Sequence, residues 1–116
     1  MDINQEFWAA INELVSTSSI VIDRPKGSTH PQYPGLLYEV DYGYLEGTSS
    51  MDREGIDVWV GTAAERRVDA IMCTVDLMKR DSEIKLLIGC TEREKDLVYH
   101  THNDTEYRKG ILIRRT

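Results

Sequence analysis

The segment Asp41-Tyr42-Gly43-Tyr44, followed after a short interval by Asp52-Arg53-Glu54-Gly55-Ile56-Asp57-Val58-Trp59-Val60, decides how this chain is interpreted. The first part is rich in β-forming residues, and the second enters an apolar strand directly after a turn. Three carboxylates, Asp52, Glu54 and Asp57, stand within six positions there. At ~4 Å and an effective dielectric constant near ~20, each like-charged pair costs about 4 kcal/mol. A hard divalent cation such as Mg²⁺ is the simplest group that would offset this repulsion.

The rest of the chain predicts short strands and two helices. Apolar residues at helical spacing over 7–15 indicate an N-terminal helix that stops at the Ser/Thr run 16–19. Strands are expected at 20–22, within 36–44, at 56–60, in a hairpin over 68–88 and at 110–114. Thr91 and Glu94 form a capping-box pattern, which starts a helix running to about residue 102. We therefore predict a mainly β (α+β) fold: a small, OB-like barrel of five or six strands with an N-terminal and a C-terminal helix.

Length and charge narrow the class of protein. The chain has 116 residues, which is the length of one ordinary domain. Its net charge of −6 argues against nucleic-acid binding, which requires a basic face. No apolar run reaches the ~20 residues that a membrane helix needs, and the acidic start does not resemble a signal peptide. With only two cysteines at no metal-binding spacing, we expect a cytoplasmic protein with reduced thiols.

Two motifs carry a resemblance to a known family. The step Tyr42-Gly43-Tyr44 and the pattern Asp52-x-Glu54-x-x-Asp57-Val58-x-Val60 resemble the soluble family I inorganic pyrophosphatases. The similarity extends upstream to residues 22–28 and downstream to Asp76 and Asp81-x-Glu83-x-Lys85. It implies a single pyrophosphatase-like domain over 1–116, with Mg²⁺ as cofactor and Mn²⁺ as an alternative. It also implies hydrolysis of pyrophosphate or a related phosphoanhydride by metal-activated water, and a homo-oligomer, since the family often forms multimers.

The resemblance also assigns roles to individual residues. Glu54 would orient or deprotonate the attacking water, and Asp57 would be shared between two metals. Lys85 would contact phosphate, and Tyr42 would lie near the reacting group. The metal ligands implied are Asp52, Glu54, Asp57, Asp76 and either Asp81 or Glu83, because Asp81 keeps the spacing from Asp76 and Glu83 keeps the spacing to Lys85. Lys26, Lys85, Tyr107 and Arg108 are the implied substrate contacts.

Departures from the family pattern motivate a second hypothesis. The interval from Ser28 to Tyr42 is too short for the family's hairpin and its arginine, and Lys26 and Arg24 are the candidates to replace that arginine. Glu54 replaces an aspartate, and a misplacement of ~1 Å can cost about 10²-fold in rate. The alternative is therefore a catalytically weak or inactive pyrophosphatase-like domain that binds metal, a phosphorylated ligand or a partner protein.

Each candidate residue also has a plainer interpretation. The three turn carboxylates could be solvated caps, Tyr42 could simply pack in the barrel, and Lys85, which points opposite to its apolar neighbours, could face solvent. The pattern His100-x-His102-x-Asp104 is not expected to bind a metal jointly, because helical residues two apart do not share a face.

Overall fold

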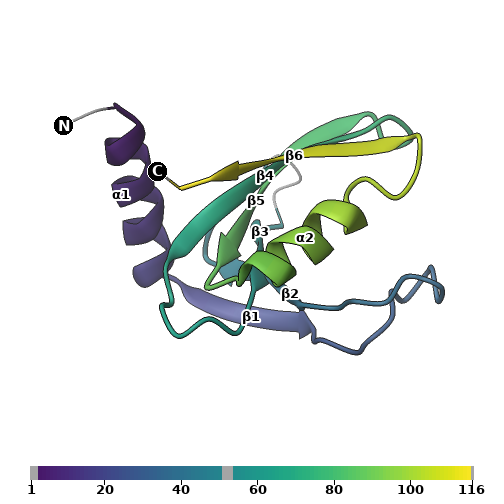
Figure 1. The fold of residues 1–116 in the computed structure, drawn as a ribbon, viewed down its shortest axis with the longest axis horizontal. Coiled ribbons are helices and arrows are strands. Elements are labelled where there is room, and N and C mark those ends of the chain that lie inside the picture. The colour runs from purple at the N-terminus through teal and green to yellow at the C-terminus, as the bar shows by residue number, and fades with distance from the viewer. Residues whose placement is uncertain (1–2, 51–53, 116) are drawn as a thin grey trace.

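The computed structural model describes residues 3–50 and 54–115 of the chain. Two helices and six strands make up the fold (Figure 1). In chain order they are α1 (Ile3–Ser16), β1 (Ser19–Arg24), β2 (Asp41–Glu46), β3 (Ile56–Val60), β4 (Val68–Asp76), β5 (Asp81–Ile88), α2 (Glu92–Thr101) and β6 (Arg108–Arg114). This confirms the predicted fold class, a mainly β, OB-like fold with a helix at the N-terminus and another near the C-terminus. Neither described helix has the length and apolar character needed to cross a bilayer.

The six strands form one sheet in the order β1-β2-β3-β5-β4-β6. All neighbouring pairs are antiparallel except β3 and β5, which run parallel. In the described part of the chain β1 and β6 are the edge strands and do not pair with each other, so the sheet curls without closing. Figure 1 shows α1 at one end of the molecule and α2 across the sheet, between β1–β2 and β4–β6.

Each face of the sheet carries its own apolar cluster, because successive strand residues point to opposite faces. Toward α1, Trp8 packs with residues such as Val58 and Leu86. Toward α2, Val98 packs with a second group that includes Trp59 and Leu87. The alternation of Val58 with Trp59, and of Leu86 with Leu87, therefore assigns one residue of each pair to each face.

Local signals set the bounds of both helices. α1 ends where Ser18 donates a hydrogen bond to the Leu14 carbonyl at 2.6 Å, as expected for a Ser/Thr run that competes with the helical pattern. At the start of α2 the predicted capping box is present. The Thr91 hydroxyl accepts from the Glu94 amide, and the Glu94 carboxylate accepts from the Thr91 amide.

Residues 36–40 depart from the prediction, because β2 begins only at Asp41. Residues 25–40 instead form a long loop that folds back on itself. Gly27 and Tyr38 are joined by a hydrogen bond of 2.8 Å, and Tyr38 donates to the Ser28 carbonyl at 2.9 Å. These bonds satisfy the backbone within the loop, while the Tyr38 side chain is buried in the cluster beneath α2. The loop lies at the end of the molecule opposite to α1 (Figure 1).

Candidate functional site

A cavity of about 560 Å³ opens on the α2 face of the sheet. We call it the Lys85 cavity. All six strands, the loop 25–40 and the end of α2 contribute to its lining. Its charged lining residues are Asp23, Arg24, Glu54, Asp57, Asp76, Lys79, Asp81, Glu83, Lys85, Arg108 and Lys109. Segments more than fifty residues apart in the chain therefore bring their charges to one concave surface.

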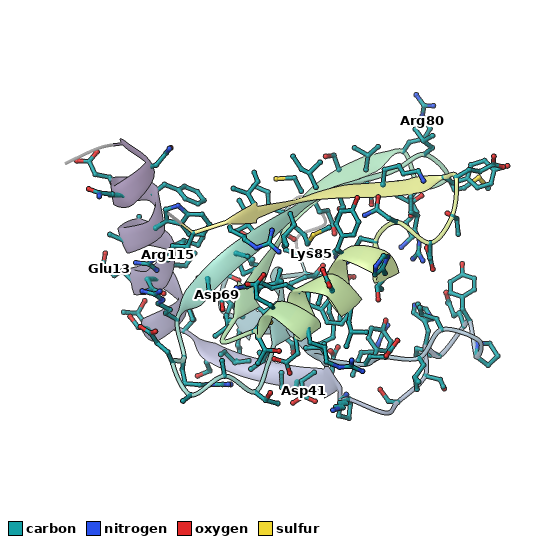
Figure 2. The ribbon with its side chains drawn as sticks, in the orientation of Figure 1. Glu13, Asp41, Asp69, Arg80, Lys85 and Arg115 are labelled. Atoms are coloured by element: carbon teal, nitrogen blue, oxygen red, sulfur yellow. The ribbon has the colours of Figure 1, made fainter. Side chains whose placement is uncertain are left out.

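Lys85 is the centre of this cavity. Its ammonium donates hydrogen bonds to Asp57 at 2.7 Å, to the Tyr42 hydroxyl at 2.9 Å and to Glu83 at 3.1 Å. The residue is only 8% exposed, and Figure 2 shows it inside the molecule, whereas Arg80 projects from the β4–β5 turn. The plainer interpretation of Lys85 as a solvent-facing lysine is therefore wrong.

The neighbours of Lys85 keep it charged. Burial by itself lowers the pKa of the amine, but the charge of Asp57 and the hydrogen bonds to Asp57 and Tyr42 outweigh burial, and the pKa is raised. The pKa of the Tyr42 hydroxyl is also raised, chiefly because the hydroxyl is buried. At neutral pH the cavity thus holds a protonated amine next to a protonated phenol.

Strand register explains how these side chains meet. Val58 pairs with Leu86 between the parallel strands β3 and β5, so Asp57 and Lys85 lie side by side on the opposite face. Tyr42 pairs with Trp59 across β2 and β3 and shares that face.

The remaining acidic positions follow from the hairpin of β4 and β5. Asp76 pairs with Asp81 on one side and with Arg108 of β6 on the other. Both carboxylates and Glu83 line the Lys85 cavity, so the structure does not separate Asp81 from Glu83 as alternatives. One oxygen of Asp76 accepts the backbone amides of Met78 and Lys79, each at 3.0 Å. Asp76 thus serves the turn as well as the cavity.

Of the three turn carboxylates, the structure describes Glu54 and Asp57. Glu54 lines the Lys85 cavity near the start of β3. Asp52 lies outside the described residues, so its predicted role as a ligand stays a prediction.

Two arginines are held at the cavity by neighbours. Arg24 donates to the Tyr38 hydroxyl at 2.7 Å and lies over the Tyr38 ring. Arg108 contacts both oxygens of Asp104, at 2.6 and 2.7 Å. Of the two candidates to replace the family's missing arginine, only Arg24 lines the cavity; the structure does not bring Lys26 to it.

Lys26 and Tyr107 lie apart from the other predicted substrate contacts. The backbone amide of Lys26 donates to Asp41 at 2.7 Å on an exposed part of the loop. Tyr107 is exposed, although its neighbour Arg108 lines the cavity. Substrate contacts by Lys26 and Tyr107 stay predictions.

The cavity has an aromatic wall, which apart from Tyr42 was not predicted from the sequence. It consists of His30, Tyr38, Tyr42 and Trp59, and His102 lies beside it. The Trp59 indole donates to His102 at 3.2 Å. Burial, together with the charges of Lys85 and Arg108, lowers the pKa of His102 to about 3, so the ring is neutral. Asp57 and Trp59 are two residues apart in one strand, so both point to the same face. This spacing was the feature of the sequence that could have indicated the aromatic wall.

The donor chemistry of the cavity fits a hard divalent cation. Its carboxylates supply the oxygen ligands that Mg²⁺ and Mn²⁺ prefer. Among residues 3–50 and 54–115, however, no three acidic, histidine or cysteine side chains are gathered closely enough to hold a metal ion. Asp57 and Glu83 contact the Lys85 ammonium in this arrangement.

The fold has counterparts among solved structures. The inorganic pyrophosphatase of Coxiella burnetii matches with a TM-score of 0.54 and 18% identity, over 70% of this chain and 66% of that one. The enzyme of Helicobacter pylori gives 0.57 and 14%, over 84% and 77%. That of Neisseria gonorrhoeae gives 0.54 and 15%, over 84% and 75%. This chain therefore has the fold of inorganic pyrophosphatases and spans just under two thirds of the length of the Coxiella protein.

Sequence comparison adds nothing to this similarity of fold. No model of a protein family matches the sequence, and no curated protein matches it.

Proposed function

We propose that this chain is a single pyrophosphatase-like domain that hydrolyses pyrophosphate, or a related phosphoanhydride, with bound Mg²⁺. One observation carries the proposal. Asp57, Asp76 and Glu83, which come from three different strands, line one cavity together with the buried Lys85. If the matched motifs belong to one site, their side chains should come together in this way. Unrelated surface residues would not be expected to do so.

The charge balance of the Lys85 cavity indicates why a cation would be needed. Its lining has six carboxylates and five lysine or arginine side chains, so it does not attract a polyanion by itself. When bound, Mg²⁺ supplies positive charge at the phosphoryl oxygens and lowers the pKa of a coordinated water. The carboxylates would hold the cation, and Mn²⁺ is an alternative with the same preference for oxygen ligands.

The chain's own residues would supply the remaining functions. Arg24 and Arg108, each already oriented by a neighbour, would contact phosphoryl oxygens. The Tyr42 hydroxyl accepts a hydrogen bond from Lys85 and, being protonated, would donate its own hydrogen in the same region. Glu54 would orient or deprotonate the attacking water.

The test is phosphate release from pyrophosphate with and without Mg²⁺. We expect release that depends on Mg²⁺ and collapses in Asp57→Asn. Asp96→Asn is the matched control, because Asp96 is an exposed carboxylate on α2. The absence of turnover with Mg²⁺ or Mn²⁺, at enzyme concentrations that reveal slow reactions, would refute the proposal.

One observation favours the alternative of a binding domain without activity. Lys85 already occupies Asp57 and Glu83, and no three-ligand metal cluster is formed among the described residues. The alternative predicts stabilisation by a ligand without product. Ligand at about 100-fold over Kd would raise the free energy of unfolding by about 2.7 kcal/mol.

The cytoplasmic location, the homo-oligomer and the lack of nucleic-acid binding stay predictions. Cell fractionation, sedimentation and a DNA-binding assay would test them in turn.

A further inference from the structure

The Lys85 cavity has an aromatic side that pyrophosphate alone would not use. The rings of Tyr42 and Trp59 are 4.5 Å apart, and that of Tyr38 lies 5.9 Å from Trp59. His30 continues the wall from the loop, 6.5 Å from Tyr38 and nearly parallel to it, with planes 18° apart. Pyrophosphate has no apolar surface to place against such a wall.

The size of the cavity points in the same direction. Its volume of about 560 Å³ lies in the range of roughly 300–1,000 Å³ that is usual for pockets that bind organic ligands. Such pockets combine hydrophobic and aromatic walls with a few polar groups that fix orientation. Pyrophosphate would fill only the charged part.

The state of His30 favours stacking over binding of phosphate. Burial lowers the pKa of His30, and so do the nearby charges of Arg24, Lys79 and Arg108. The imidazole is therefore neutral at pH 7 and presents a flat ring. Arg24, Lys79 and Arg108 line the same cavity as His30, so an anionic group attached to a stacked ring would find cationic partners there.

We infer that the ligand of the Lys85 cavity is a nucleoside diphosphate, with its base against His30 and Tyr42, the partly exposed rings of the aromatic wall, and its phosphates toward Arg24 and Arg108. This inference rests on the proposed function, because it names the substrate class for the same site. In hydrolysis the oxygen of water bonds to the terminal phosphorus and the bridging P–O bond breaks. Nucleoside monophosphate and inorganic phosphate leave, and one proton passes to solvent.

Two non-hydrolysable analogues test the inference by calorimetry in Mg²⁺ buffer. Methylenediphosphonate represents pyrophosphate, and α,β-methylene-ADP adds the nucleoside to the same core. Stacking on an aromatic side chain is worth roughly 1–3 kcal/mol per base, so we expect the nucleoside analogue to bind at least about fivefold more tightly.

Variants of His30 locate the effect. His30→Ala should shrink the affinity ratio between the two analogues, whereas His30→Phe, which keeps a flat ring, should retain it. His100→Ala is the matched control, since His100 is an exposed histidine on α2 outside the cavity lining.

The possible failures are distinguishable. If methylenediphosphonate binds and the nucleoside adds no affinity, the inference is overturned while the proposed function stands. If His30→Ala lowers the affinity for both analogues equally, the aromatic wall does not recognise a base and the inference is also overturned. If neither analogue binds, both the inference and the proposed function fail.

Discussion

Replacing Lys85 by methionine is the sharpest perturbation that this structure offers. Methionine keeps much of the volume of the lysine stem but removes the ammonium, which joins Asp57, Glu83 and Tyr42 at 2.7–3.1 Å. The side chains of Lys85, Asp57 and Glu83 are 11%, 23% and 14% exposed. Water therefore reaches the two carboxylates only poorly, and both would lose the ammonium that joins them.

The expected loss of stability follows from these contacts. Removing one partner from a buried ion pair costs about 3–5 kcal/mol, because an uncompensated charge remains. Since Asp57 and Glu83 keep some contact with water, we place the loss at about 3 kcal/mol. That is a large share of the ~5–15 kcal/mol that stabilises an ordinary domain.

Urea denaturation followed by tryptophan fluorescence would measure this loss, since both Trp8 and Trp59 are buried. Lys26→Met is the control, because it removes an exposed lysine. The double variant Lys85→Met/Glu83→Gln should recover part of the loss, since it removes the charge of one of the two carboxylates that contacted the ammonium. A loss below about 1 kcal/mol in Lys85→Met, or no recovery in the double variant, would refute the assignment of Lys85 as the counter-ion.

The same variant separates the roles of Lys85 in binding and in turnover. In the wild-type protein its ammonium occupies carboxylate oxygens that a divalent cation would also use. Calorimetric titration without substrate should therefore show tighter Mn²⁺ binding by Lys85→Met, while phosphate release from pyrophosphate falls. Weaker Mn²⁺ binding would mean that Lys85 supports the metal site rather than competing with it.

Three further substitutions test the fold around the site. Because the pKa of His102 is lowered in the folded protein, the unfolded chain takes up a proton at this residue below about pH 6.5 while the folded chain does not. The free energy of unfolding should therefore fall by about 2 kcal/mol between pH 6.5 and 5. In melts across this range, His102→Gln should reduce the dependence of stability on pH. Gly43→Ala would drive a methyl group into the β1 backbone and should cost about 3 kcal/mol or more in urea denaturation, whereas Gly35→Ala, with open space around it, should cost little. Glu94→Ala would remove the acceptor of the Thr62 amide and hydroxyl, and we expect a loss of about 2 kcal/mol; an unchanged denaturation midpoint would contradict that role.

Much of the fold could be predicted because its signals are local. The strand 56–60, the hairpin over 68–88 and the capping box at Thr91 each depend on residues close together in the chain. The segment 36–40 was misjudged for the opposite reason. Tyr38 is buried by contacts with Arg24 and Trp59, which come from different strands. The β-forming residues around Tyr38 therefore belong to a packed loop and not to a strand.

The candidate site was only partly open to prediction. Motif resemblance named Asp57, Asp76, Glu83 and Lys85, and the structure places all of them at one cavity. The resemblance did not indicate the contact between Lys85 and Asp57. That contact depends on the parallel pairing of β3 with β5, and pairing partners are not encoded locally. The same limit applies to His102, whose partner lies 43 residues away in the chain.

The pairing of β3 with β5 ties the stability of the fold to the geometry of the cavity. Val58 and Leu86 are paired in the core toward α1, which places Asp57 and Lys85 together on the other face. A slip of one residue would exchange Leu86 and Lys85 between the faces, exposing an apolar side chain to the cavity and burying an amine in the core. Both errors are costly, so the register that packs the core is also the one that forms the ion pair. Substitutions at Val58 or Leu86 should therefore disturb the Lys85 cavity even though neither side chain enters it.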